Sequence, residues 1–139
     1  MCGAGYISTY TVRNNGIATA VTPLLKRKSL VKISEAAFTR QVVELLTACG
    51  WRVYHPLPAQ HRNGRWATAT QGHTGWPDIA AAHKQHGFIL AELKTATGRV
   101  SDNQKAWLHT LVSAGVEAYV WRPADIDVIR DRAQGIHTN

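Results

Sequence analysis

Two short apolar runs separated by a polar turn constrain the fold of this chain most. Residues 79–82 read Ile-Ala-Ala-Ala and residues 88–91 read Phe-Ile-Leu-Ala, with His-Lys-Gln-His-Gly between them. Runs of this length around a glycine-containing polar turn are typical of a β-hairpin. The second run is apolar at every position, which favours a central strand covered by helices on both faces. The sequence therefore predicts an antiparallel strand pair inside a covered sheet.

Acidic residues flank the open end of this predicted hairpin. If Ala82 faces Phe88, the numbers of opposed residues sum to 170, which places Asp78 across from Glu92. The β-carbons of such a pair lie roughly 4.5 to 5.5 Å apart. Two carboxylates this close repel each other unless a cation lies between them, and hard divalent cations such as Mg²⁺ prefer carboxylate oxygens. Lys94 shares the face of Glu92 because side chains alternate along a strand.

The surrounding motifs indicate phosphodiester chemistry. Asp78 ends the motif Gly-Trp-Pro-Asp at 75–78, and Glu92 opens the motif Glu-Leu-Lys at 92–94. A bound Mg²⁺ or Mn²⁺ would neutralise a phosphate oxygen and lower the pKa of a bound water. Lys94 would orient the hydroxide or shield the phosphorane as an ammonium, without acting as a base. Zinc is disfavoured, because the only ligand-like histidine spacing, His83-x-x-His86, falls in the predicted hairpin loop.

Composition supports one basic domain. The 139 residues fit a single domain, and 45% hydrophobic residues suffice for a core. The net charge of +7 favours a polyanionic partner such as nucleic acid. Cys2 and Cys49 form no ligand-like pattern, and no apolar run approaches the roughly 20 residues of a membrane span. These features predict a soluble cytoplasmic protein with no membrane partner.

Residues 1–33 show no clear helical or strand period and are expected to form a poorly ordered or partner-dependent arm. The arm ends in a basic cluster, Leu-Lys-Arg-Lys-Ser-Leu-Val-Lys at 25–32. This cluster is either a solvated tail or a phosphate-contacting segment that adds salt-sensitive affinity. The remaining chain divides into a predicted folded domain at 34–134 and a polar tail at 135–139.

A first helix is predicted from Ser34, as N-cap, to about Cys49. Glu35 falls on the apolar stripe of this helix and is expected to face inward, whereas Glu44 faces solvent. A buried acid needs a partner, which makes Glu35 a candidate site residue. Alternatively, Glu35 only interacts with the helix dipole at the first turn.

A strand at 51–55 is followed by a long polar connection at 57–74. Within it, Arg62 and Arg65 are candidates for phosphate contacts, and Trp66 is a candidate for stacking on an unpaired base. The alternative is that these three side chains coat a mobile surface hairpin. Sequence alone leaves both interpretations open.

A second helix is predicted from Ser101 to Gly115. Gln104 lies on its apolar face, where its amide would point to the sheet, but it also completes a Ser-x-x-Gln capping box. Both roles stay open. Arg99 and Lys105, at the start of this helix, are further candidates for nucleic-acid contacts. A strand at 116–121 and a short helix from Pro123 to about Arg132 complete the prediction.

The Gly-Trp-Pro-Asp motif, the Glu-Leu-Lys motif and Gln104 in the following helix together resemble the VRR-NUC nucleases of the PD-(D/E)XK superfamily, over roughly residues 34–125. The resemblance implies an α/β fold of the restriction-endonuclease-like type, with a central mixed β-sheet flanked by helices in the order α-β-β-β-α-β. It also implies that Asp78, Glu92 and the backbone carbonyl of Leu93 bind the metal. Glu35 would be the acidic residue of the first helix, binding through water, Lys94 would assist the attacking water, and Gln104 would lie near the site.

The function that the resemblance implies is Mg²⁺-dependent or Mn²⁺-dependent endonuclease cleavage of DNA, selective for branched substrates such as four-way junctions or flaps. Small members resemble phage or bacterial proteins that act as homodimers, which would give paired cuts across a symmetric junction. Alternatives are an exonuclease, a sequence-guided endonuclease, a nucleic-acid-binding module without turnover, and an α/β domain whose acids only pair with surface arginines.

Overall fold

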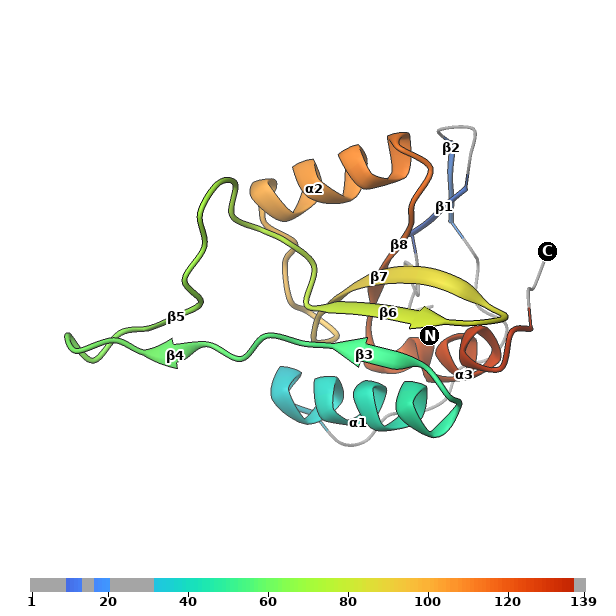
Figure 1. Cartoon of the computed structure of the whole chain (residues 1–139), viewed down its shortest axis with the longest axis horizontal. Coiled ribbons are helices and arrows are strands. Elements are labelled where there is room, and N and C mark those ends of the chain that lie inside the picture. Colours follow the sequence, from blue (N-terminus) through green and yellow to red (C-terminus); the bar gives the residue numbers. More distant parts are fainter. Residues whose placement is uncertain (1–9, 14–16, 21–31, 137–139) are drawn as a thin grey trace, which may run out of the picture.

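A computed structural model describes residues 10–13, 17–20 and 32–136 (Figure 1). Its centre is a four-stranded mixed sheet with strand order β3-β6-β7-β8. The elements of this core are α1 (Glu35–Ala48), β3 (Arg52–Tyr54), β6 (Ile79–His83), β7 (Gly87–Leu93), α2 (Asp102–Ser113) and β8 (Glu117–Trp121). Their order along the chain is the predicted α-β-β-β-α-β, and the α/β fold of restriction-endonuclease-like type is confirmed.

The predicted hairpin register is also confirmed. β6 and β7 pair antiparallel, with Ile79 opposite Ala91 and Ala82 opposite Phe88. β3 pairs antiparallel with β6 on one side, and β8 pairs parallel with β7 on the other. The parallel pair needs a crossover connection, which α2 supplies. β7 is therefore an interior strand, as its apolar composition predicted.

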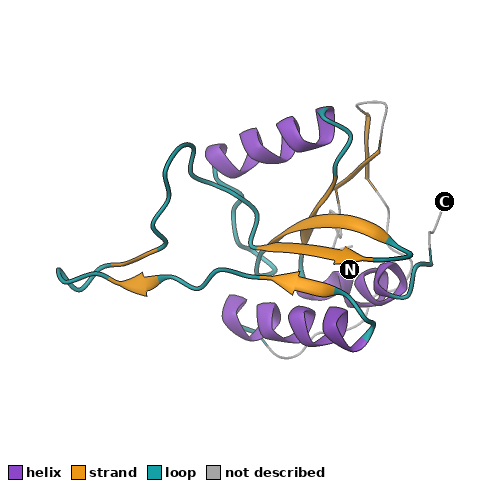
Figure 2. Ribbon diagram, viewed as in Figure 1, coloured by secondary structure: helices purple, strands orange, loops and turns teal. Residues whose placement is uncertain are grey.

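Helices cover both faces of the sheet (Figure 2). α1 and α3 (Ile126–Ala133) pack on one face, where Ile89, Ala91 and Leu93 of β7 join the larger core cluster. α2 packs on the opposite face, where Leu90 contacts Leu111 and its neighbours. Because side chains alternate along β7, Glu92 lies on the α2 side of the sheet.

The helix ends follow the capping residues. Ser34 Oγ accepts a hydrogen bond from the Ala37 amide at 3.1 Å, which fixes the start of α1 as predicted. The final helix differs from the prediction, because Pro123–Asp125 forms a separate 3₁₀ turn, η1, and α3 begins only at Ile126. The carboxylate of Asp125 accepts from the Arg122 amide at 2.8 Å and holds this tighter turn.

The amino-terminal arm contains a β-hairpin, to which the sequence analysis assigned no strand. β1 (Tyr10–Arg13) pairs antiparallel with β2 (Ile17–Ala20), and β1 lies beside β8. Residues 1–9, 14–16, 21–31 and 137–139 lie outside the described residues, including Cys2, most of the basic cluster and most of the polar tail. The order of the arm and its need for a partner stay predictions. Cys49 is a free thiol.

The long connection between β3 and β6 contains a second hairpin, formed by β4 (Ala59–Gln60) and β5 (Trp66–Ala67). This hairpin projects from the body as an extended arm (Figure 1). We call the segment from Leu57 to Thr74 the β4–β5 arm. Over the part of the chain that the structure describes, none of the helices has the length and apolar character needed to cross a membrane.

Candidate active site

Polar side chains from just before β6, from the end of β7 and the residue after it, and from α2 meet at one end of the sheet. Lys94 Nζ lies 2.7 Å from Glu92 Oε1, and Gln104 Nε2 donates to the same oxygen at 2.5 Å. Asp78, directly before β6, accepts a hydrogen bond from the Leu93 amide through Oδ2 at 2.8 Å. The structure thus brings together Asp78, Glu92, Lys94 and Gln104, which the sequence analysis had grouped. We call these four residues the carboxylate cluster.

Glu92 is the most constrained member of this cluster. The residue is 1% exposed, and its Oε2 atom has no hydrogen-bond partner within the described part of the chain. Burial raises the pKa of the Glu92 carboxyl to about 7; the hydrogen bond from Lys94 opposes this change, and the charge of Asp78 adds to it. A buried acceptor without a donor is costly, and a cation beside Oε2 would remove that cost.

Gln104 fills both roles that the sequence left open. Its Oε1 atom accepts from the Ser101 amide at 2.8 Å, and Ser101 Oγ accepts from the Gln104 amide at 3.2 Å. These bonds form the predicted capping box at the start of α2. The Nε2 end of the same side chain is left to hold Glu92. One amide therefore ties the helix start to the carboxylate cluster.

Asp78 is held from two sides. The Leu93 amide donates to its carboxylate, and His55 Nδ1 lies 2.7 Å from its backbone oxygen. The N–H and C=O of one residue in an extended strand point to the same side, so the Leu93 carbonyl also faces Asp78. The sequence analysis missed His55. The sequence places His55 at the end of a predicted strand. That position indicates a contact with Asp78 only once β3 is known to pair with β6.

The Gly-Trp-Pro-Asp motif is docked on α2. Gly75 has a φ of +96°, and a β-carbon there would lie 2.6 Å from the backbone carbon of Asn103. Asn103 Nδ2 donates to Thr74 Oγ1 at 2.9 Å, and the rings of Trp76 and Trp107 pack edge to face with centroids 4.9 Å apart. The glycine is required because backbone meets backbone at this point. These contacts position the segment that carries Asp78.

The prediction that Glu35 faces inward is wrong. Glu35 is exposed, because it opens α1, whose buried residues begin only at Phe38. In addition, α1 packs on the face of the sheet opposite Glu92. The first turn of α1 lies at the same end of the sheet as the end of β7 (Figure 1). From this edge Glu35 still acts on Lys94, since its charge helps to raise the pKa of the ammonium. Glu35 is therefore at the rim of the cluster.

Lys94 remains a cation. Burial lowers the pKa of its ammonium, but the hydrogen bond and charge of Glu92 outweigh burial, so that the pKa lies above its ordinary value. A further basic residue, Arg122, follows β8 where the parallel register places it next to Lys94. Its guanidinium donates to the Thr95 carbonyl. Sequence analysis missed Arg122, because its proximity depends on the β7–β8 pairing.

The predicted nucleic-acid contacts lie outside this cluster. Arg62, Arg65 and Trp66 are exposed on the β4–β5 arm. Arg99 and Lys105 are exposed around the start of α2, where Lys105 makes only a 3.4 Å surface ion pair with Asp102. These side chains are free to meet a large ligand but do not contact the carboxylates.

Both flanking helices begin at this edge of the sheet. α1 and α2 both start at the end of the sheet where β6 begins and β7 ends (Figure 1). The N-terminus of a helix carries a partial positive charge and unpaired backbone N–H groups, which favour anions. The carboxylates of the cluster can bind a cation, and the nearby N-termini of α1 and α2 suit a phosphate.

The donor set fits Mg²⁺ better than zinc. Among the described residues, no group of three or more His, Cys, Asp or Glu side chains lies close enough together to hold a metal ion. Mg²⁺ usually keeps several waters and binds through one or two carboxylates plus substrate phosphate. Asp78, Glu92 and the Leu93 carbonyl would suffice for such a site, and the unpaired Glu92 Oε2 is the observation that favours it.

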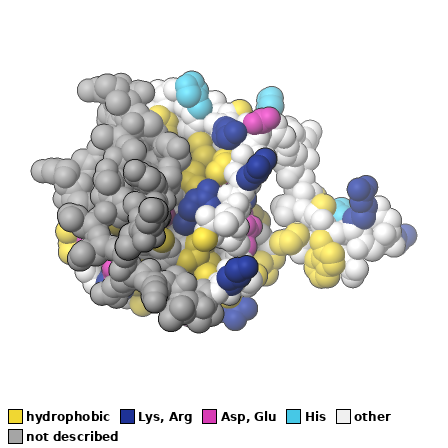
Figure 3. Space-filling model, turned by 180° about the vertical axis from the view of Figure 1, so that it is seen from behind, with side chains coloured by type: hydrophobic (Ala, Val, Ile, Leu, Met, Phe, Trp, Pro, Cys, Tyr) yellow, Lys and Arg dark blue, Asp and Glu magenta, His cyan; other side chains and the backbone are white. Residues whose placement is uncertain are grey.

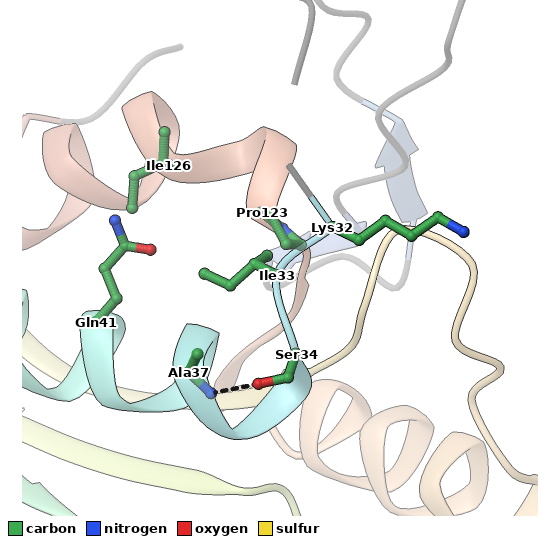
Figure 4. A pocket seen from close by; sticks show the side chains of 7 residues that line it. All are labelled: Lys32, Ile33, Ser34, Ala37, Gln41, Pro123 and Ile126. Carbon is green, nitrogen blue, oxygen red and sulfur yellow. Dashed lines mark hydrogen bonds between the residues drawn. The ribbon is translucent and has the colours of Figure 1, made fainter. Parts of the chain in front are cut away.

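A separate pocket of about 590 Å³ lies between the start of α1 and the η1–α3 segment (Figure 4). It is lined by Lys32, Ile33, Ser34, Ala37, Gln41, Pro123 and Ile126. None of these residues belongs to the carboxylate cluster, and the lining contains no acid. This pocket is therefore distinct from the candidate active site.

The raised pKa of Glu92 predicts a pH-dependent stability of the metal-free protein. A carboxyl whose pKa rises on folding stabilises the fold while it is protonated, and this contribution is lost as the pH rises through the folded value. A change in the pKa of Glu92 from 4.5 to about 7 corresponds to a loss in the free energy of unfolding on the order of 3 kcal/mol as the pH rises between these values. Urea unfolding in EDTA at pH 5 and pH 8 should show this loss in the wild type and not in Glu92→Gln. Equal pH dependence of both proteins would contradict it.

Comparison with protein-family models matches residues 32–125, more than half of the chain, to the VRR-NUC domain. Neither the curated proteins nor the solved structures include a match. The match spans every residue of the carboxylate cluster and the whole β4–β5 arm.

Proposed function

Because this chain belongs to the VRR-NUC family, a nuclease domain family of the PD-(D/E)XK-like superfamily, we propose that it is a Mg²⁺-dependent endonuclease that hydrolyses phosphodiester bonds in branched DNA. The family match carries the assignment as a nuclease, with DNA as the substrate that such a domain implies. The buried Glu92 carboxylate carries the proposal of metal dependence. Its Oε2 atom is unpaired beside Asp78, and both acids lie among groups that suit a phosphate.

Each residue of the cluster has a distinct role in this proposal. Asp78, Glu92 and the Leu93 carbonyl would hold Mg²⁺ or Mn²⁺, which lowers the pKa of a bound water and stabilises negative charge on the phosphate. Gln104 keeps Glu92 in place from the first turn of α2. Lys94, as a permanent cation, orients the nucleophile and stabilises the charge that develops on the phosphate oxygens. Glu35 acts from the rim, through water.

The preference for branched DNA and the action as a homodimer belong to the same proposal. Two equivalent active sites related by a two-fold axis would cut a symmetric four-way junction at paired positions. Light scattering of the protein alone and of its complex with a junction would measure the number of copies. A single copy that makes both cuts would contradict the homodimer.

The experiment that tests the function is a cleavage panel. End-labelled four-way junction, flap, linear duplex and single-stranded DNA of equal length would be incubated with Mg²⁺, Mn²⁺ or EDTA. We expect internal cuts near the branch with either metal and none in EDTA. Stepwise removal of terminal nucleotides would instead identify an exonuclease. Binding without cleavage under every condition would identify a non-catalytic nucleic-acid-binding module.

The two acids of α1 give a matched test of the rim position. Glu35→Gln is expected to lower the cleavage rate about tenfold, because its charge acts on Lys94 at the edge of the site. Glu44→Gln removes the same charge from the solvent face of the same helix and should leave the rate within about twofold. Initial rates on the four-way junction at fixed Mg²⁺ measure both. Equal rates for the two variants would remove Glu35 from the site.

A further inference from the structure

The tip of the β4–β5 arm is ordered by its own hydrogen bonds. The His61 amide donates to the Arg65 carbonyl at 2.8 Å, and the Gly64 amide donates to the His61 carbonyl at 2.9 Å. Asn63 Oδ1 accepts from the Arg65 amide at 3.1 Å, and Gln60 Nε2 donates to the Gly64 carbonyl at 3.3 Å. The tip therefore keeps a defined turn without packing on the body, and it presents its side chains to solvent.

The side chains of the arm suit nucleic acid. Arg62 and Arg65 are exposed, and Trp66 exposes 66% of its surface on the adjacent strand. No Asp or Glu occurs between Glu44 and Asp78, so that no acid on the arm opposes these cations. Seen from behind, the arm shows Lys or Arg side chains beside apolar atoms (Figure 3). An exposed aromatic ring on the same hairpin as two exposed arginines offers stacking together with phosphate binding.

The arm is also tied to the candidate active site. It leaves the body at the end of the sheet where β6 begins and β7 ends (Figure 1), which is the end next to Asp78 and Glu92. Its last residues lead into the Gly-Trp-Pro-Asp motif, and Thr74 and His73 are bound to α2 through Asn103 and Trp107. A ligand held by the arm would therefore extend across the edge that carries Asp78.

The exposed tryptophan discriminates between DNA structures on physical grounds. Inside a linear duplex each base is stacked on both faces, and a tryptophan could stack there only after unstacking a base step at a cost of a few kcal/mol. A branch point offers a base with a free face at little cost. Trp66 should therefore bind best where base stacking is interrupted.

We propose that the β4–β5 arm is a branch-recognition finger, in which Trp66 stacks on a base whose face is left free at a DNA branch while Arg62 and Arg65 bind the adjoining phosphates. This inference rests on the proposed function in taking branched DNA as the substrate. It assigns the choice of DNA structure to the arm and leaves the hydrolysis to the carboxylate cluster. Removing the ring should therefore change which DNA is bound.

The test measures binding in EDTA, where the proposed cleavage does not occur. Fluorescence anisotropy of the full chain would give Kd for a four-way junction and for a blunt linear duplex at fixed salt. Trp66→Ala is expected to weaken junction binding about tenfold and duplex binding less than twofold. Trp66→Phe should recover most of the loss, because phenylalanine retains a stacking face. Tyr54→Ala, which removes an aromatic side chain of similar exposure from β3, is the control and should change neither Kd by more than twofold.

The arginines have a different expected signature. Arg62→Gln and Arg65→Gln should each weaken binding to both DNAs and lower the slope of log Kd against log salt by about 0.9. Lys84→Gln removes one exposed cation from the β6–β7 turn at the opposite end of the sheet, and should leave that slope unchanged. A slope that changes equally in all three variants would show that only net charge matters.

A probe at the branch separates stacking from general affinity. We expect a 2-aminopurine placed at the branch to be quenched by the wild type and by Trp66→Phe, and not by Trp66→Ala. Equal loss of junction and duplex binding in Trp66→Ala, or quenching that persists in this variant, would overturn the finger. If the protein cleaves no DNA but Trp66→Ala still loses junction binding selectively, the nuclease proposal fails and the finger stands. If the protein cleaves junctions and Trp66→Ala binds them normally, the finger fails and the nuclease proposal stands.

Discussion

Replacing Glu92 by Gln is expected to lower Mg²⁺-dependent cleavage by at least about a thousandfold, which is the largest effect on activity that we predict. Glutamine keeps the shape of the side chain, and its amide oxygen can still accept from Gln104 and Lys94, which both contact Oε1 in the wild type. The other end of the amide is a donor, and it would point hydrogens at the place where Oε2 is now unpaired. The substitution thus removes a cation site with little change in packing.

The measurement is the initial rate of junction cleavage together with thermal unfolding with and without Mg²⁺. A ligand that binds only the folded state raises the midpoint of unfolding. Mg²⁺ should raise this midpoint in the wild type and leave it unchanged in Glu92→Gln and Asp78→Asn. Glu44→Gln is the control for removal of one carboxylate and should behave like the wild type. A Glu92→Gln protein that cleaves within tenfold of the wild-type rate would refute the role of this carboxylate.

Gly75→Ala is expected to destabilise the protein by about 3 kcal/mol or more and to lower cleavage about a hundredfold. An alanine at positive φ costs roughly 1–2 kcal/mol. Gly75 adds a steric conflict, because its β-carbon would lie 2.6 Å from Asn103 and 2.8 Å from the Gln104 amide, and both partners are backbone atoms. Relief requires the 75–78 segment to move off α2, and a shift of about 1 Å in a catalytic group can cost a hundredfold in rate.

Gly72→Ala provides the matched control. Gly72 belongs to the same connection and has a φ of +100°, but nothing lies within 4 Å of its added β-carbon. The Gly72→Ala protein should lose only the roughly 1–2 kcal/mol that an alanine at positive φ costs, because no atom collides with the added β-carbon. It should cleave DNA nearly as fast as the wild type. Urea unfolding and initial rates distinguish the two variants. Equal stability and equal cleavage rates of Gly75→Ala and Gly72→Ala would show that the close approach of the Gly-Trp-Pro-Asp motif to α2 affects neither stability nor activity.

The register of the β6–β7 hairpin was predictable from the sequence because both of its determinants are local. Two apolar runs of matched length around a short turn fix which residues oppose each other, and period-two alternation then fixes the face of each side chain. The pairing of Ala82 with Phe88 brought Asp78 and Glu92 together without knowledge of the rest of the chain. The capping box of Gln104 was predictable for the same reason.

The errors concern relations between elements. A helical wheel assigned Glu35 to the buried stripe, but it does not say where along the helix burial begins, and the buried residues of α1 start only at Phe38. It also does not say which face of the sheet the helix covers, and α1 covers the face opposite Glu92. His55 and Arg122 reach the site through strand pairings that span long connections. Neither pairing follows from local periodicity, because the connection lengths leave strand order open.

The dual use of Gln104 links local melting to loss of function. Its two amide atoms serve the helix start and Glu92 at once, so fraying of one turn releases the carboxylate even while the sheet stays intact. Warming should therefore inactivate the enzyme at a temperature below that at which the whole domain unfolds, and a stronger N-terminal cap on this helix would raise its working temperature.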